Sequence, residues 1–185
     1  MSLETTIYSD NDIHFVDGAN ANTNYNAIDS VGAGNDSDSP DTFRSAIKFT
    51  FTSLPAGISI VSATLRCVVR FNTASNIRTH RIYKITSDWD KTTVTWNTQP
   101  SYTTELGATS IGTAPSIGSN IDWTLTASEI AGYYLGTTTN YGFFMKADTE
   151  SDDTHEYWSS RNGTASNRPQ LIITYNPPTR RSQFV

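Results

Sequence analysis

Short apolar or alternating runs recur along the chain, and turn-forming residues separate them. Gly, Pro, Asn or Asp residues lie between consecutive runs, which is the pattern that many short β-strands leave in a sequence. The runs cover residues 5–8, 13–16, 27–31, 43–52, 60–71, 78–86, 93–96, 121–125, 141–146, 155–159 and 170–175. This pattern predicts an all-β protein, an antiparallel two-sheet jelly-roll β-sandwich.

Three of the runs indicate which side chains face the interior. In residues 43–51 and 65–71, aromatic and aliphatic residues alternate with Arg, Lys and other residues. Alternate residues of a strand point to opposite faces, so the apolar set forms the core. Residues 93–96, which follow a tryptophan, alternate in the same way. We therefore expect a core that includes Phe49, Phe51, Leu65, Val69, Trp89 and Trp96.

One short helix is predicted at residues 128–135. Thr126-Ala-Ser-Glu129 has the form of a capping box, in which the Thr hydroxyl and the Glu side chain each bond the other residue's backbone. An apolar stripe at helical spacing follows, and Gly136 suits the left-handed position that ends a helix.

The composition agrees with this fold and excludes several classes of protein. Thr, Ile and Val make up 50 of the 185 residues, and such β-branched side chains favour strands over helices. No apolar run approaches the roughly 18 residues of a membrane span, so membrane insertion is not expected. The net charge is −5, whereas nucleic-acid-binding domains are usually basic. We expect one domain over residues 1–176 and a tail over 177–185, because Pro177-Pro178 cannot continue a ladder.

The single cysteine, Cys67, excludes an internal disulfide and a cysteine-based metal site. It lies in an apolar run, which indicates a buried and unreactive thiol. The chain begins without the basic and apolar segments of a secretory signal peptide. We expect an extracellular or cell-surface location as part of a larger protein, or a place in a virion that is released by lysis.

A cluster of bases is the sharpest local signal. Five of the 13 basic residues fall within 19 positions, and no Asp or Glu occurs in residues 62–87. We expect residues 60–71 and 78–86 to pair as a hairpin, which would place the bases on one sheet. A guanidinium group can donate two parallel hydrogen bonds to one carboxylate, so the cluster predicts a site for an acidic polysaccharide. The alternative is a solvated face with ion pairs to distant acids. The predicted ligand-binding residues are Arg66, Arg70, Arg78, Arg81 and Lys84.

Two acidic loops are candidates for structural calcium, and no other cofactor is expected. One loop holds Asp36, Asp38 and Asp41, and the other spans residues 148–156. Hard cations prefer several loop oxygens, but neither loop has EF-hand spacing. Solvated loops are the alternative.

Catalysis is not expected. A glycosidase needs two carboxylates that face each other across a cleft, whereas the acids here fall in predicted surface loops. His14, His80 and His155 share no ligand spacing, and no nucleophile elbow or phosphate-binding loop occurs.

Aromatic residues outside the expected core are a second candidate for sugar binding. Tyr102, Trp123 and Trp158 lie outside the segment from Trp89 to Trp96 or near predicted loops, so they are freer to bind. Packing in the core or at its rim is the alternative.

Several stretches together resemble a known family. They are residues 22–25 with 30–32, residues 44–49 with 54–57 and 60–65, residues 85–89 with 93–100, and residues 140–144 with 159–161 and 168–171. This combination resembles the DNRLRE domain, which is related to the disaggregatase-type repeat and to carbohydrate-binding module family 96. The block from Trp89 to Pro100 and the terminal Arg168-Pro-Gln-Leu171 are its most specific parts. Asp90-Lys91 departs from the Ser-Glu that the family often has.

The resemblance implies a jelly roll without catalysis, found on cell-surface, secreted and phage-borne proteins. Some members bind acidic polysaccharides such as alginate. The first hypothesis is therefore a surface module that binds an acidic polysaccharide or mediates attachment. The alternative is a structural virion protein, a phage decoration or tail component that uses the jelly roll to assemble with other virion proteins.

Overall fold

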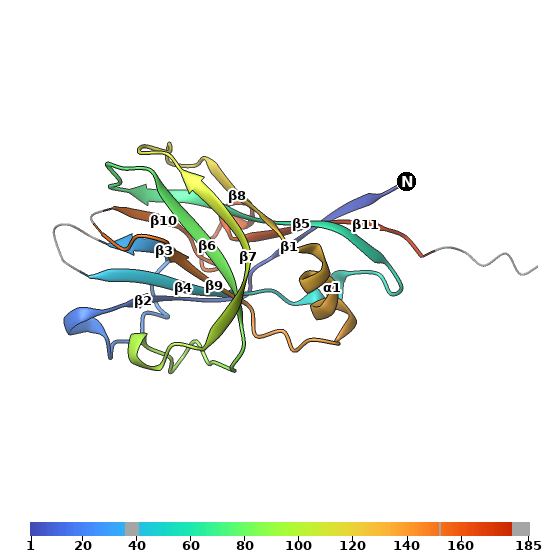
Figure 1. Cartoon of the computed structure of the whole chain (residues 1–185), viewed down its shortest axis with the longest axis horizontal. Helices are drawn as coiled ribbons and strands as arrows, with labels where there is room; N and C mark the ends of the chain where they lie inside the picture. The colour runs from blue at the N-terminus through green and yellow to red at the C-terminus, as the bar shows by residue number, and fades with distance from the viewer. Residues whose placement is uncertain (36–40, 152, 179–185) are drawn as a thin grey trace, which may run out of the picture.

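The computed structural model describes residues 1–35, 41–151 and 153–178. These residues form eleven strands, one α-helix and four short 3-10 helices (Figure 1). The strands are β1 (Leu3–Tyr8), β2 (Asn11–Val16), β3 (Ser30–Asn35), β4 (Thr42–Lys48), β5 (Ser59–Asn72), β6 (Arg78–Ile85), β7 (Tyr102–Ile111), β8 (Asn120–Leu125), β9 (Phe143–Ala147), β10 (Thr154–Trp158) and β11 (Gln170–Asn176). The helices are η1 (Gly18–Asn20), η2 (Phe51–Ser53), η3 (Trp96–Thr98), α1 (Ala127–Leu135) and η4 (Ala165–Asn167). The predicted all-β class with one short α-helix is confirmed.

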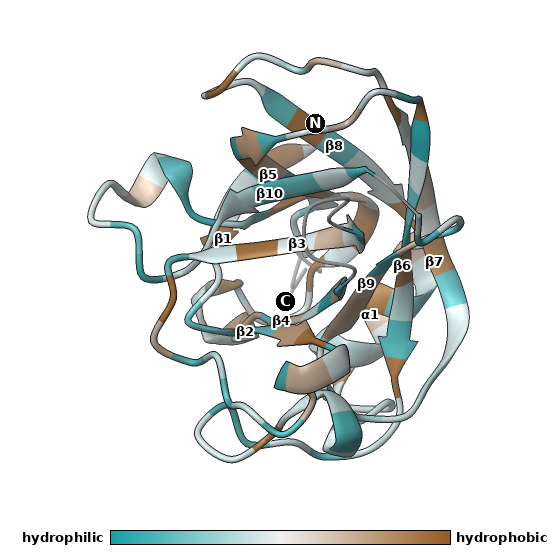
Figure 2. Cartoon of the chain, turned by 90° about the vertical axis from the view of Figure 1, so that its left-hand side faces the viewer, coloured by the Kyte–Doolittle hydropathy of each residue, from teal (hydrophilic) through white to brown (hydrophobic). Residues whose placement is uncertain are grey.

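The strands form one continuous antiparallel sheet that curls around a common interior (Figure 2). Its order is β1-β11-β5-β10-β3-β4-β9-β6-β7, with β2 added to β4 and β8 added to β5. Strand β5 pairs first with β11 and then with β10, while β8 lies along its other edge. Because β5 joins strands from both sides of the interior, the predicted division into two separate sheets is not confirmed.

The curled sheet nearly closes where β7 meets β8. No ladder joins these two strands in the described part of the chain, but Thr109 Oγ1 donates a hydrogen bond to the Asp122 carbonyl (2.6 Å). Gly107 permits this approach, since a Cβ at its position would lie 2.3 Å from the Thr124 carbonyl oxygen. A side chain there would push the strands apart.

The main hydrophobic core fills the interior of this ring. Phe49, Leu65 and Val69 are at most 1% exposed, which confirms their predicted burial. Phe51 lies in η2 rather than in a strand and is only half-buried. Strand β4 ends at Lys48, before Phe49, so the predicted alternation does not continue to Phe51. Its ring packs against the core, but the prediction that it is buried was wrong.

A second hydrophobic cluster lies on the outer side of β4. Ala46 is completely buried, although it points away from the interior, because Phe15, Phe144 and the segment 86–101 cover it. Trp89 and Trp96 belong to this segment and remain half-buried. Their predicted burial was therefore wrong: they lie at the margin of the outer cluster.

Other strand predictions also differ from the structure. Residues 93–96 are not a strand but a turn that leads into η3, with Asp90 Oδ1 accepting a bond from the backbone N–H of Thr92 (2.8 Å). Strand β7 was not predicted. In the described part of the chain it pairs only with β6, and half of its residues are exposed while two are buried, so it has little apolar alternation. Strand β3 begins at Ser30, after a turn.

Helix α1 begins after Thr126 and ends at Gly136, whose φ of 69° is left-handed as predicted. The predicted capping box does not form. Thr126 Oγ1 donates instead to the Leu106 carbonyl (3.1 Å), and the Glu129 carboxylate accepts a bond from Lys84 Nζ (2.7 Å). Contacts to the sheet therefore replace the local contacts of the capping box.

The first strand of the chain pairs with the last. Strand β1 lies beside β11 over its whole length, and β11 lies beside β5. Strand β11 ends at Asn176, directly before the Pro-Pro pair and one residue beyond the predicted run 170–175. Among the described residues, no helix has the length and apolar character needed to cross a membrane.

Candidate functional site

The five predicted ligand-binding bases do not share one surface. Strand β6 pairs with β9 and β7, so the predicted hairpin between β5 and β6 was wrong. Arg66 and Arg70 lie beside β8 and β10 respectively, at different places along β5. On β6, Arg81 points to the opposite side of the strand from Arg78 and Lys84, because successive side chains alternate.

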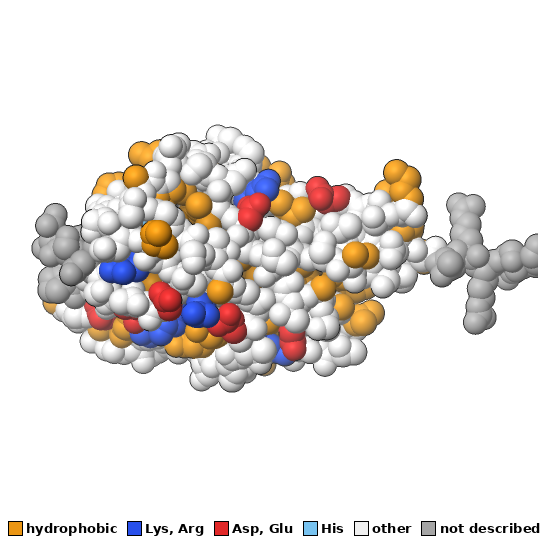
Figure 3. All heavy atoms as spheres, turned by 45° about the horizontal axis from the view of Figure 1, so that its top comes forward, with side chains coloured by type: hydrophobic (Ala, Val, Ile, Leu, Met, Phe, Trp, Pro, Cys, Tyr) orange, Lys and Arg blue, Asp and Glu red, His pale blue; other side chains and the backbone are white. Residues whose placement is uncertain are grey.

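Each of these bases forms an ion pair. Arg66 makes a two-point contact with Asp122, which lies directly opposite on β8, with both bonds 2.7 Å long. The other pairs join Arg70 to Asp29 and Glu156, Arg78 to Asp153, Arg81 to Glu105 and Lys84 to Glu129. On the face shown in Figure 3, basic side chains lie beside acidic ones. This arrangement fits the alternative interpretation of a solvated face with ion pairs, and a role for these bases in binding stays a prediction.

The acidic loops contribute no metal centre within the described residues. Asp36, Asp38 and Asp152 lie outside the described part of the chain. Asp41 Oδ2 accepts a hydrogen bond from Asn20 Nδ2 (3.2 Å). Among the described residues, no group of three or more His, Cys, Asp or Glu side chains could hold a metal ion. Calcium binding by these loops stays a prediction.

The fold brings two of the three histidines together inside the ring. The rings of His80 and His155 lie edge to face with centroids 5.1 Å apart, and Tyr157 Oη lies 3.2 Å from His80 Nδ1. Burial, with a smaller contribution from His155, lowers the pKa of His80 to about 3. Burial also lowers the pKa of His155. Both rings are therefore uncharged at neutral pH and belong to the core.

The aromatic candidates pack against their neighbours. Trp123 is completely buried and donates its indole N–H to the His80 carbonyl (2.9 Å). Tyr102 stacks on Phe144 with centroids 4.3 Å apart. Trp158 is half-buried, with the Arg70 guanidinium 5.2 Å from its ring. Trp123 thus belongs to the core, while Tyr102 and Trp158 keep partly exposed rings.

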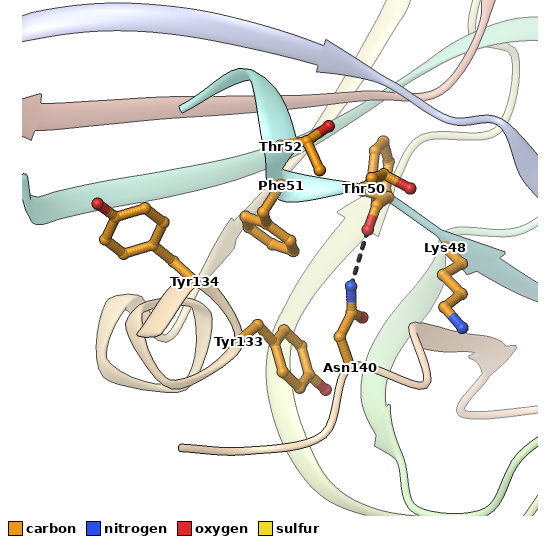
Figure 4. Close-up of a pocket in the computed structure, with 8 residues that line it drawn as sticks. Lys48, Thr50, Phe51, Thr52, Tyr133, Tyr134 and Asn140 are labelled. Carbon is orange, nitrogen blue, oxygen red and sulfur yellow. Dashed lines mark hydrogen bonds between the residues drawn. The ribbon is translucent and has the colours of Figure 1, made fainter. Parts of the chain in front are cut away.

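An open pocket of about 380 Å³ lies between the end of β4 and helix α1 (Figure 4). Residues 48–52 line one side, and Tyr133, Tyr134 and Asn140 line the other. The pocket exists because the chain leaves β4 after Lys48 and turns into η2, which places the ring of Phe51 opposite the helix. The rings of Phe51 and Tyr133 are tilted, with centroids 6.3 Å apart. The pocket therefore combines aromatic rings with hydroxyl, amide and amine groups.

Hydrogen bonds connect the two sides of the pocket. Asn140 Nδ2 donates to the Phe49 carbonyl (2.8 Å), which Figure 4 marks as a dashed line. Tyr134 Oη donates to the Pro55 carbonyl (2.7 Å) and accepts from the backbone N–H of Ile58 (3.4 Å). These bonds fix the helix and the following loop against the segment that leaves β4.

Two polar groups of the lining have no partner among the described residues. The amine of Lys48 forms neither an ion pair nor a hydrogen bond there. Tyr133 is only 5% exposed, and its hydroxyl is buried without a hydrogen-bond partner. Burial raises the pKa of Tyr133, with a smaller contribution from Glu129. The pocket thus offers an uncompensated cation, whereas the Tyr133 hydroxyl is enclosed beneath its lining.

This pocket could not be recognised from the sequence. Its two sides come from distant segments: Tyr134 and the Pro55 carbonyl that it bonds are 79 positions apart. The available signals were the adjacent tyrosines on a short predicted helix and the phenylalanine that follows a strand end. Neither signal indicates that the two segments meet.

Comparison with known families agrees with the resemblance found in the sequence. The family model described as carbohydrate-binding module family 96 matches residues 4–175, which is nearly the whole chain. No curated protein matches the chain significantly. The chain belongs to carbohydrate-binding module family 96.

Proposed function

We propose that this module binds an acidic polysaccharide without cleaving it, outside the cell or at a surface, and that the pocket between β4 and α1 is its binding site. The observation that carries the proposal is the combination, in one open pocket, of three aromatic rings with the unpaired Lys48 amine.

The lining suits a sugar. Ligand pockets are concave, largely apolar and supplied with a few polar groups that fix orientation. Phe51, Tyr133 and Tyr134 provide apolar ring surface, and the hydroxyls of Thr50 and Thr52 provide polar groups. The described lining contains no carboxylate, so it lacks the pair of acids that glycoside hydrolysis requires.

Lys48 supports the preference for an acidic ligand. The five bases of the predicted cluster are already compensated by acids, whereas the Lys48 amine is not. An ammonium group can form charge-assisted hydrogen bonds to a sugar carboxylate. Asp10, whose carboxylate accepts a bond from Thr50 Oγ1 (3.0 Å), is the nearby acid that would oppose such a ligand.

Calorimetry with alginate and pectate oligomers tests the proposal. Lys48→Gln should weaken binding by about fivefold to tenfold, because an exposed charge pair contributes about 1 kcal/mol. Asp10→Asn should strengthen it. Raising the salt concentration should weaken binding to the wild type more than to Lys48→Gln, because screening acts on the charge pair. Neutral glucan oligomers should bind far more weakly.

Lys146→Gln is the matched control. Lys146 lies on β9, outside the pocket lining, and also lacks an acidic partner among the described residues. Lys146→Gln removes the same charge as Lys48→Gln, and it should leave the affinity for the glycan unchanged. Equal losses in the two lysine variants would refute the pocket. Loss of binding in Arg66→Ala with Arg70→Ala would instead favour the predicted basic cluster. If no acidic glycan binds, the proposed function fails and the structural surface protein gains support.

A further inference from the structure

The loop between β10 and β11 contains an asparagine that is followed directly by a glycine. Asn162-Gly163 is the only Asn-Gly pair in the sequence. Asn162 is half-buried, whereas Gly163 is exposed, and a Cβ at position 163 would meet no atom within 4 Å. The backbone nitrogen of Gly163 is therefore shielded neither by a side chain of its own nor by neighbouring atoms from the amide of Asn162.

Hydrogen bonds in the loop hold the Asn162 amide in place. Its Oδ1 accepts a bond from the backbone N–H of Thr164 (2.9 Å), which forms an Asx turn, and a longer bond from Asn167 Nδ2 (3.5 Å). When a nucleophile attacks Asn162 Cγ, negative charge develops on Oδ1. Donors that are already directed at this atom stabilise that charge, so the turn favours attack on the amide carbon.

The peptide unit that supplies the nucleophile is polarised by a cation. The N–H of Gly163 donates to no group in the described part of the chain. The carbonyl of the same peptide unit, that of Asn162, accepts a bond from Arg168 Nε (2.7 Å). Arg168 forms no ion pair with an acid among the described residues. Its uncompensated charge stabilises the deprotonated, nucleophilic form of the Gly163 nitrogen.

We infer that Asn162 is a self-modification site, at which the chain converts its own amide into a carboxylate through a cyclic imide. The Gly163 nitrogen gives its proton to solvent and forms a bond to Asn162 Cγ. The bond from Cγ to Nδ2 breaks, and Nδ2 takes a proton from water and leaves as ammonia. A water molecule then opens the imide. Attack at Cγ leaves aspartate, and attack at the backbone carbonyl carbon leaves isoaspartate, in which the main chain continues through Cγ.

The two products fit the loop differently. An aspartate at position 162 can still accept the bond from the Thr164 N–H, and it adds a negative charge close to Arg168. Isoaspartate lengthens the main chain by one carbon. It therefore displaces the loop relative to Arg168 and to Ser160, whose N–H and hydroxyl donate to the buried Asp12 carboxylate (2.7 and 3.0 Å).

Incubation of the full chain at pH 7.5, followed by peptide mass spectrometry, tests the inference. Asn162 should become an acid before any other asparagine does. The folded protein should convert at least about threefold faster than a synthetic peptide of residues 158–169, which lacks the fixed donors. Gly163→Ala has open space for its Cβ and no left-handed φ to strain. It should slow conversion by about tenfold or more, because the methyl group hinders the approach of the nitrogen to Cγ.

Two arginine variants test the polarising bond. Arg168→Gln should slow conversion about fivefold in the folded protein and leave the rate in the peptide nearly unchanged. Arg161→Gln is the matched control: it removes the same charge next to Asn162, but the Arg161 guanidinium bonds to Asn26 instead, so the rate should not change.

Two results would overturn the inference. One is an Asn162 that converts more slowly in the folded wild type than in the peptide, which would mean that the fold protects the amide. The other is an equal rate in the two folded arginine variants. The comparison of wild type with peptide needs no substitution, so it remains decisive if a variant fails to fold.

Discussion

Lowering the pH from 7 to 4.5 should remove much of the stability of this protein, because its histidines are buried in the uncharged form. Burial lowers the pKa of His14 to about 4 and that of His80 to about 3, and it also lowers that of His155. In the unfolded chain each imidazole has a pKa of about 6.5. Below that pH the unfolded state binds protons that the folded state does not, so stability falls as the pH falls.

The size of the effect follows from the width of this pH window. A histidine that stays neutral in the fold costs about 1.4 kcal/mol per pH unit below 6.5. Between pH 6.5 and 4.5, His14 and His80 together therefore remove about 5 kcal/mol, and His155 acts in the same direction. Burial raises the pKa of Asp12, so protonation of this carboxyl favours the fold and offsets part of the loss. The remaining loss is still large beside a typical stability of about 5–15 kcal/mol.

Urea unfolding at half-unit steps from pH 7.5 to 4.5 measures the slope of stability against pH. His80→Phe isolates one contribution, because it keeps an aromatic ring in place but cannot titrate. Whatever its effect on total stability, the variant should flatten the slope below pH 6 by about 1.4 kcal/mol per unit. A wild-type slope below about 1 kcal/mol per unit, or an unchanged slope in the variant, would refute the reasoning.

Three further substitutions should change stability, each measured by urea unfolding at pH 7.5. Asp153→Asn should cost about 3 kcal/mol, because this fully buried carboxylate accepts bonds from Ser75, Asn76 and Arg78, and breaking a buried ion pair is costly; a cost under about 1 kcal/mol would contradict its role. Gly107→Ala should cost about 1–3 kcal/mol by forcing β7 away from β8, whereas Gly112→Ala, which has open space around its Cβ, should stay within about 0.5 kcal/mol of wild type. Phe49→Ala should cost about 3–5 kcal/mol through lost burial and a cavity, and a loss below about 1 kcal/mol would mean that its environment can collapse around the gap.

The sequence could predict the strands whose two faces differ. In β5, Leu65 and Val69 alternate with arginines, and their burial is correct. Strand β7 could not be found in this way, since an edge strand with few buried residues shows little alternation. Residues 93–96 also alternate, but they form a loop and not a strand. The apolar residues of this loop pack against the outer side of β4. Alternation of apolar and polar residues indicates which side chains are buried. It does not indicate whether a strand or a loop holds them, or against which element they pack.

Neither the predicted basic cluster nor the pocket could be assessed from the sequence, because both depend on contacts between segments that are distant in the chain. Arg66 and Arg81 are close in sequence, but β5 and β6 pair with different strands, and Asp122 and Glu105 neutralise them from elsewhere in the chain. Neighbouring strands in a sequence pair in most folds, and this chain is an exception at that connection. The pocket around Phe51 could not be predicted either, because it requires the end of β4 and helix α1 to lie side by side.

The pairing of β1 with β11 has a consequence for how the module can be made. During synthesis the first strand leaves the ribosome without its partner, and β5 also waits for β11 and β10. The sheet therefore cannot be completed until nearly the whole chain has emerged. Folding dominated by such distant pairings is slow, on the order of milliseconds to seconds. A protease that removed β11 would uncover an edge of β5 and detach β1 in a single cut, so the last strand should be among the least tolerant of truncation.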